Sequence, residues 1–512
     1  MKHAVSAGDH YMSTPCLNSD VLWIIFSFNT FSDDDFTKGD DNRVPTDKFL
    51  LTARHTSQVC KLWRSIMLSS PRVWANVLNF RYLQQKDNTW RNEVLRRTGT
   101  ALLSVIGHDL KKDAPGINFF LSLVSQKARR IRRILTSTKG DHQGVAYDLS
   151  WTSIFLQEVP HLEIACFTYY NAQGYSGLNK SLSKIVLFNN KRSKIHTLIL
   201  RGFQLFLPGP WNATIRRLEI EMGIIEHPFI LSLNCMRQLE SLYIKKLRIM
   251  EDPEEEVKIP NIRQFYFENN LRSAAVLLDL MLPTEGSTSS ITIIERESDI
   301  LPDQLQSRLC NGLIRHLKGR FSDKLSLNIQ NSRIKLANAL TFSTLETINA
   351  TFTLSFNFFT DIIQCLLLNI LSAGSIATSI THLDLYLDYF EFGKHDGVDE
   401  LVECLFNSMQ SVEVLCTTMY DLPILTERLH KPEICFPRLH TLAMKPQTQS
   451  ITITLVDFIE KRRRVGFPLK KITATGFERV DPDVLWYLRG RSDLEFEWVR
   501  PPSRWETRRR RM

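Results

Sequence analysis

The sequence lacks the motifs that carry most known catalysis. It has no GxGxxG, P-loop, HExxH or GxSxG pattern, and its 21 glycines among 512 residues leave few candidates for a phosphate-binding loop. Nine cysteines are scattered without a CxxC pair, and thirteen histidines form no cluster at zinc-ligand spacing. We therefore expect no enzymatic activity, no metal site and no cofactor.

Long apolar runs are also missing. The longest, Val21–Phe26 and Leu366–Leu371, fall far short of the roughly 20 residues that cross a bilayer. The first sixteen residues are polar and small, unlike a secretory leader. We expect an intracellular protein, cytoplasmic or nuclear or both, without membrane contact and with reduced, mostly buried thiols.

Charge is moderately positive, at +9, which suggests contact with acidic surfaces and does not by itself imply nucleic acid. Basic residues cluster at Arg129–Arg133, Lys461–Arg464 and Arg508–Arg511. Apolar neighbours at helical spacing predict that the first two clusters are the solvated faces of helices. The third belongs to a basic tail, whose role the sequence does not reveal.

The N-terminal region predicts a short helical unit. Residues 17–28 form an amphipathic pattern that Asn18 or Ser19 can cap, with Asp20 placed favourably in the first turn. A three-to-four spacing puts several apolar side chains on one face of this helix: Leu17, Val21, Leu22, Ile25 and Phe26. An acidic stretch, 31–43, is typical of a loop.

Two further helices are predicted after that loop. Residues 48–68 return to helical spacing, with Val59, Trp63 and Ile66 on one side. Pro71 is well placed to begin a short third helix.

These residues resemble an F-box. The closest likeness is Val59-Cys-x-x-Trp-Arg64 followed by Ser70-Pro-x-Val-Trp74, and the likeness covers about residues 17–78. Asn18 stands where the family usually has proline, and an insertion separates the first two helices, as in F-box proteins of mushroom-forming fungi.

The resemblance implies a partner and a site. F-box helices bind a Skp-family linker and, through it, a cullin. The residues that would face the linker, or in part form a small internal core, are Leu17, Val21, Leu22, Ile25, Phe26, Val59, Cys60 and Trp63. The alternative is a helical cap on the domain that follows.

The rest of the chain shows a loose repeat of the type L-x-x-L-x-L. Copies begin at Val159, Ile195, Ile215, Leu239, Ile262, Leu325, Leu345, Ile380, Leu439 and Leu469, with helix-like segments between several of them. A single short strand buries little, but stacked neighbours build a continuous core. We therefore predict inward-facing side chains at Leu218, Leu242, Phe265 and Leu383.

The expected fold is α + α/β: an N-terminal three-helix F-box-like unit followed by an irregular leucine-rich-repeat-like α/β solenoid. The predicted domains are a flexible N-terminus (1–16), the F-box-like domain (17–80), the solenoid (81–499) and the basic tail (500–512). A compact α/β domain with sequential strands is the alternative to the solenoid.

The expected function is a substrate-recruiting adaptor of a Skp–cullin–F-box ubiquitin ligase. The repeat domain would bind a target protein that the sequence does not identify. The alternative is a non-ligase repeat scaffold or nucleic-acid-associated protein that uses the basic segments, although nucleic acid is the less expected partner.

Overall fold

A computed structural model of the chain contains two compact units, Met1–Arg217 and Leu218–Met512. The N-terminus 1–16, the loop 31–43, the repeat copy at Leu345 and the tail 500–512 lie outside the residues that the structure describes. The described residues are 17–30, 49–85, 87–110, 115–140, 157–171, 194–202, 210–221, 224–225, 227–249, 261–281, 287–294, 302–317, 324–330, 333–337, 352–357, 366–367, 369, 376–387, 402–404, 406–429, 435–445, 450–477 and 479–499.

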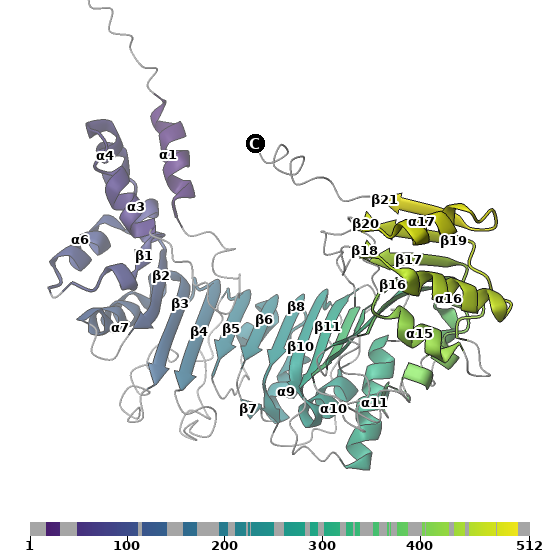
Figure 1. Cartoon of the computed structure of the whole chain (residues 1–512). Helices are drawn as coiled ribbons and strands as arrows, with labels where there is room; N and C mark the ends of the chain where they lie inside the picture. The colour runs from purple at the N-terminus through teal and green to yellow at the C-terminus, as the bar shows by residue number, and fades with distance from the viewer. Residues whose placement is uncertain are drawn as a thin grey trace, which may run out of the picture. The chain divides into compact units, whose positions relative to one another are not determined.

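The first unit begins with helices α1 (Ser19–Phe28), α3 (Phe49–Thr56), α4 (Lys61–Leu68) and α5 (Pro71–Ala75) (Figure 1). Asn18 caps α1 as predicted, since its Oδ1 accepts the Asp20 N–H at 3.0 Å. The predicted second helix is in fact two, because Cys60 is extended (φ −155°, ψ 171°) and interrupts the helical backbone. Pro71 begins α5 as predicted.

A parallel sheet follows in the same unit. Its strands β1 to β5 pair in chain order, each parallel to the next. The strands and the helices among them are β1 (Leu78–Asn79), η1 (Phe80–Tyr82), α6 (Thr89–Arg97), β2 (Leu103–Leu110), α7 (Pro115–Lys127), η2 (Ala128–Arg130), β3 (Ile131–Gly140), β4 (Ile164–Asn171), β5 (Thr197–Arg201) and η6 (Pro210–Thr214).

Both faces of this first sheet are buried. Successive residues 103–106 of β2 are all buried, although neighbours on a strand point to opposite faces. Phe49 of α3 packs against a cluster formed by Ile106, Leu135, Ile164, Cys166 and Ile199. Helix α3 is therefore packed onto the sheet of its own unit.

The second unit alternates strands and helices. Its elements are β6 (Arg217–Glu221, beginning at the unit boundary), β7 (Ile224–Ile225), α9 (His227–Leu233), β8 (Ser241–Lys245), β9 (Arg248–Ile249), β10 (Gln264–Asn270), α10 (Leu271–Leu280), β11 (Thr288–Ile294), α11 (Asp303–Leu317), β12 (Lys324–Gln330), β13 (Arg333–Ala337), β14 (Phe352–Asn357), α13 (Ile376–Ser379), β15 (His382–Leu387), β16 (Val414–Thr418), α15 (Leu422–Arg428), β17 (Thr441–Lys445), β18 (Ser450–Ile451), α16 (Ile453–Arg464), β19 (Lys471–Thr475), β20 (Arg479–Val480), α17 (Pro482–Arg489) and β21 (Glu495–Val499).

The strands of the second unit pair in the order β8-β10-β11-β14-β13-β12-β15-β16-β17-β19-β21. All these pairings are parallel except the two made by β13. Strands β12, β13 and β14 thus lie in reverse order, which departs from a sequential repeat. The observed fold class is mixed α/β with parallel sheets, as predicted at that level.

The repeat pattern located strands correctly. The last apolar residue of every described copy lies on a strand, from Ile164 on β4 to Ala474 on β19. The four predicted core residues are buried, with exposed fractions of 0% for Leu218 and Leu242, 4% for Phe265 and 1% for Leu383.

The prediction that the internal basic clusters are solvated faces of helices is wrong for Arg129–Arg133. For the second cluster it is correct except at Arg462, because Arg463 and Arg464 of α16 are exposed. Residues 129–133 form a 3₁₀ turn and the start of β3, and Arg130 donates to the Ala101 carbonyl at 2.7 Å. In α16, Arg462 is only 1% exposed. Its guanidinium donates to the carbonyls of Cys435, Phe436, Leu439 and Phe467. These loop carbonyls need donors when buried, and a guanidinium supplies several at once.

Candidate interaction surface

Helices α1 and α4 pack through one side of α1. Leu22 and Phe26 are 2% and 1% exposed, and the Phe26 ring meets the Trp63 ring edge to face with centroids 5.1 Å apart. Residues four apart share a helix face, so this pair defines the inward side of α1. Two of the predicted linker-facing residues are therefore core residues of the helical unit.

The opposite side of α1 is apolar and exposed. We call it the apolar stripe; it consists of Leu17, Val21, Ile24, Ile25 and Phe28, with exposed fractions of 53%, 42%, 48%, 41% and 78%. Spacings of three and four residues align these side chains along one face. Such a surface is costly to leave in water and is typical of a docking site.

The start of α4 adds to the exposed apolar surface. Val59 and Leu62 are 61% and 45% exposed. Cys60 is also exposed, and its Sγ caps α4 by accepting the Trp63 N–H at 3.5 Å. Trp63 itself is half-buried against Phe26.

The structure thus divides the eight predicted site residues. Leu17, Val21, Ile25, Val59 and Cys60 are exposed, whereas Leu22 and Phe26 point inward and Trp63 lies between. Ile24, Phe28 and Leu62 are further exposed members of the surface that were not among the predicted site residues. Counting by three and four from Leu17 would have found the first two.

Contacts between an arginine and two tryptophans hold this helical unit against α6. The Arg97 guanidinium lies 4.6 Å from the ring centroid of Trp74 on α5 and 5.5 Å from that of Trp90 on α6. Glu93 accepts from Arg97 at 2.8 Å and from Arg96 at 2.7 Å. Hydrogen bonds from Arg96 and then Arg97 lower the pKa of Glu93 to about 2.

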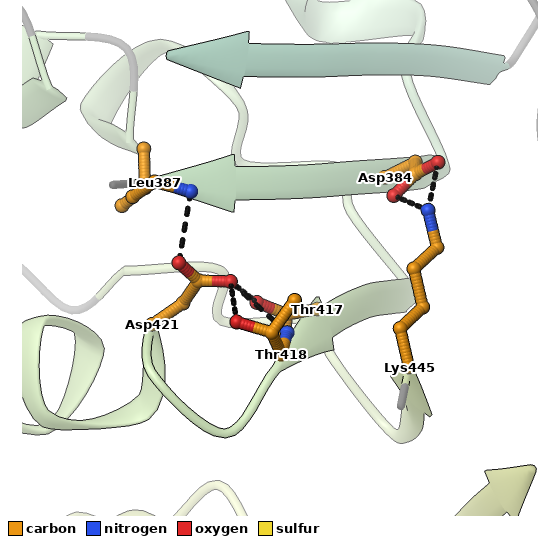
Figure 2. A network of polar contacts seen from close by, with 6 residues as sticks. All are labelled: Asp384, Leu387, Thr417, Thr418, Asp421 and Lys445. Carbon is orange, nitrogen blue, oxygen red and sulfur yellow. Dashed lines mark hydrogen bonds and ion pairs between the residues drawn. The ribbon is translucent and has the colours of Figure 1, made fainter. Parts of the chain in front are cut away.

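A second polar site lies in the other unit, at the ends of β15 and β16. Figure 2 shows the Asp421 carboxylate accepting the Leu387 N–H at 2.8 Å and the Thr417 hydroxyl at 2.9 Å. The same carboxylate accepts the Thr418 N–H at 3.0 Å and the Thr418 hydroxyl at 2.6 Å. Burial raises the pKa of Asp421 and these hydrogen bonds oppose the shift. The arrangement ties two strands to the start of α15.

Close by, Lys445 of β17 forms an ion pair with Asp384 of β15 (Figure 2). Cys416 occupies the paired position on β16 beside Asp384. Burial, assisted by the Asp384 charge, raises the pKa of Cys416 to about 12. This thiol is therefore a poor nucleophile at neutral pH, and we interpret the site as structural.

The described residues contain neither a metal-binding cluster nor a membrane-spanning helix. No group of three or more His, Cys, Asp or Glu side chains is arranged to hold a metal ion there. Nor does any helix in the described part of the chain have the length and apolar character to cross a bilayer.

No known family model matches this sequence, and no curated protein matches it.

Proposed function

We propose that this chain is a substrate-recruiting adaptor of a Skp–cullin–F-box ubiquitin ligase. Its N-terminal helices form an F-box-like module that binds a Skp-family linker. Its strand–helix region is an irregular leucine-rich-repeat-like solenoid that binds a target protein. The chain acts by proximity, because binding raises the target's concentration near the ubiquitin-loaded enzyme.

The apolar stripe carries this proposal. Among the described residues, nine of the fourteen exposed large hydrophobic side chains lie between Leu17 and Leu68. This concentration coincides with the segment that carries Val59-Cys-x-x-Trp-Arg64. An apolar surface of this kind supports permanent or tight contact with another protein.

The alternative, a nucleic-acid-associated protein using its basic segments, has less support. Arg462 and Arg133 are buried, and Arg130 and Arg132 bond to groups of their own unit. These four arginines serve the fold, which leaves fewer exposed cations in the two internal clusters for binding phosphate.

The test is capture of a recombinant Skp-family linker by the purified chain. Leu22 is unsuitable for substitution by a charged residue because it is buried. The double variant Val21→Asp, Ile25→Asp places charge on the stripe and spares the core. We expect it to lose capture while the unfolding midpoint stays unchanged.

The control is Ile453→Asp, which introduces one such charge at a 63% exposed isoleucine of α16. It should capture the linker as the wild type does. Capture by the double variant equal to that of the control would refute the proposal, as would absence of capture by the wild type.

A further inference from the structure

Helix α4 is held on two sides and is open on a third. On one side, Trp63 packs against Phe26 of α1. On another, Met67 is buried, and its carbonyl accepts the Nε1–H of Trp74 on α5 at 2.8 Å. The outward side carries four exposed side chains, spaced by three and four residues so that they follow one line of the helix: Lys61, Arg64, Ser65 and Leu68. We call these four residues the basic face.

No carboxylate lies in the chain segment that carries the basic face. From Phe49 to Gln85 the sequence has five lysines and arginines, all exposed, and no Asp or Glu, although 55 of the 512 residues are acidic. Glu93 on the neighbouring helix α6 is already engaged by two arginines of that helix. Among the described residues, no ion pair joins Lys61 or Arg64 to a carboxylate.

Aliphatic side chains accompany these cations. Leu68 follows Arg64 by four residues and is 37% exposed, and Val59 and Leu62 at the start of α4 are exposed as well. Aliphatic groups gain nothing from contact with phosphate or sugar, and two cations attract an anionic bilayer only weakly. A mixture of cations and aliphatic groups is typical of the rim of a protein–protein interface.

The basic face belongs to the same part of the molecule as the apolar stripe. Helices α1 and α4 lie side by side in the first unit (Figure 1). A protein that covers the stripe on α1 therefore reaches α4 with the edge of its contact surface. Charged groups at such an edge pair across the interface and steer association, while the apolar centre supplies most of the affinity.

We propose that the basic face binds an acidic rim on the protein that covers the apolar stripe. Carboxylates of this partner pair with Lys61 and Arg64, whose Cβ atoms are about 5–6 Å apart at this spacing on a helix. The Arg64 guanidinium presents two parallel N–H groups to one carboxylate, and the Lys61 ammonium takes a second. The inference rests on the proposed function, because it takes this partner to be the Skp-family linker.

The experiment measures the association and dissociation rates of a recombinant Skp-family linker on the purified full chain, at low and at high salt. Lys61→Gln, Arg64→Gln removes two charges and leaves two polar side chains at exposed positions. We expect association to be about tenfold slower at low salt, with dissociation nearly unchanged. The difference should shrink at high salt, because salt screens exposed charges.

The matched control is Arg463→Gln, Arg464→Gln, which removes two exposed cations from α16. It should associate as the wild type does. Lys61→Glu, Arg64→Glu reverses the charge of the basic face and should slow association further than the glutamine variant. Unfolding midpoints should agree among all four proteins, since the substituted positions are exposed.

Three results would overturn the inference. Equal slowing in the glutamine variant and in the control would indicate a general effect of net charge. Unchanged or faster association of the glutamine variant would show that Lys61 and Arg64 do not attract the linker. Tighter binding of phosphatidylserine vesicles or single-stranded RNA than of the linker, lost in the glutamine variant, would assign the basic face to another class of partner.

Failure of this inference and failure of the proposed function are distinguishable. Capture of the linker at rates that depend neither on salt nor on Lys61 and Arg64 overturns this inference and leaves the adaptor function intact. Absence of capture by the wild type overturns the adaptor function and this inference with it.

Discussion

The rings of Phe26 on α1 and Trp63 on α4 meet edge to face, with their centroids 5.1 Å apart. Phe26 is 1% exposed, while Ile25, its neighbour on α1, is 41% exposed. The aromatic contact therefore sets the rotation of α1 about its axis. That rotation is what leaves the apolar stripe available to a partner.

Truncating Phe26 should lower stability and linker binding together. Phe26→Ala removes the ring that packs on Trp63, and large-to-small changes of this kind cost about 3–5 kcal/mol. Denaturant unfolding followed by tryptophan fluorescence measures the loss. Ile25→Ala is the control, expected to change stability by less than about 0.5 kcal/mol. Similar losses for both variants would contradict this orientation of α1.

Leu242 should contribute strongly to the stability of the second unit. Its side chain is fully buried on β8, so Leu242→Ala should cost roughly 2–5 kcal/mol of unfolding free energy. Thr288→Ala, on the accessible face of β11, should cost little. A negligible loss for Leu242→Ala would show that the repeat register is misplaced at this strand.

Arg462 and Arg463 offer a matched pair on α16. Arg462 is buried among four loop carbonyls, whereas Arg463 is exposed. Arg462→Ala leaves those carbonyls without their donor and should cost about 3 kcal/mol or more, because hydrogen bonds to charged groups are among the stronger ones. Arg463→Ala should be nearly neutral in chemical denaturation. Equivalent behaviour of the two variants would refute the structural role of Arg462.

Replacing Asp421 by asparagine should lower the stability of the protein. Each Asp421 oxygen accepts from a backbone N–H or a hydroxyl. In Asp421→Asn an amide N–H₂ must face one of these donors, so we expect a loss of about 2 kcal/mol. Thermal unfolding checks it, with Asp457→Asn at an exposed position of α16 as the control. An unchanged melting temperature for Asp421→Asn would contradict the donor arrangement.

Glu93 should make the free energy of unfolding depend on pH in acidic solution. Its pKa is about 2 in the folded chain against an ordinary 4.5, because Arg96 and Arg97 stabilise the carboxylate. A lowered folded pKa means that the contribution is fully present above pH 4.5 and is lost as the pH falls through about 2. Comparing acid unfolding of the wild type with that of Glu93→Gln isolates this contribution. Parallel stability curves over this pH window would refute it.

Much of the local structure could be predicted from the sequence. The L-x-x-L-x-L copies located strands because side chains two apart on a strand share a face. The position three residues after the last apolar residue of a copy is not constant. At Asn270 it caps α10 by accepting the Ser273 N–H, whereas at Leu247 and Phe477 it holds a buried apolar side chain. The pattern does not identify β11 and β16, because the polar residues Ser289 and Thr417 stand at two of its apolar positions.

The sequence by itself determined where the strands and the N-terminal helices lie, because local periodicity reports which side chains share a face. Only the tertiary structure decided which face is covered. Phe26 points inward and Ile25 outward because Trp63, distant in sequence, packs on one of them. Likewise, Arg462 is buried and Arg463 exposed because the loop carbonyls beside α16 come from residues 435–439 and 467. The reversal of β12, β13 and β14 has the same origin: strand order depends on pairing between distant segments, which local patterns do not encode.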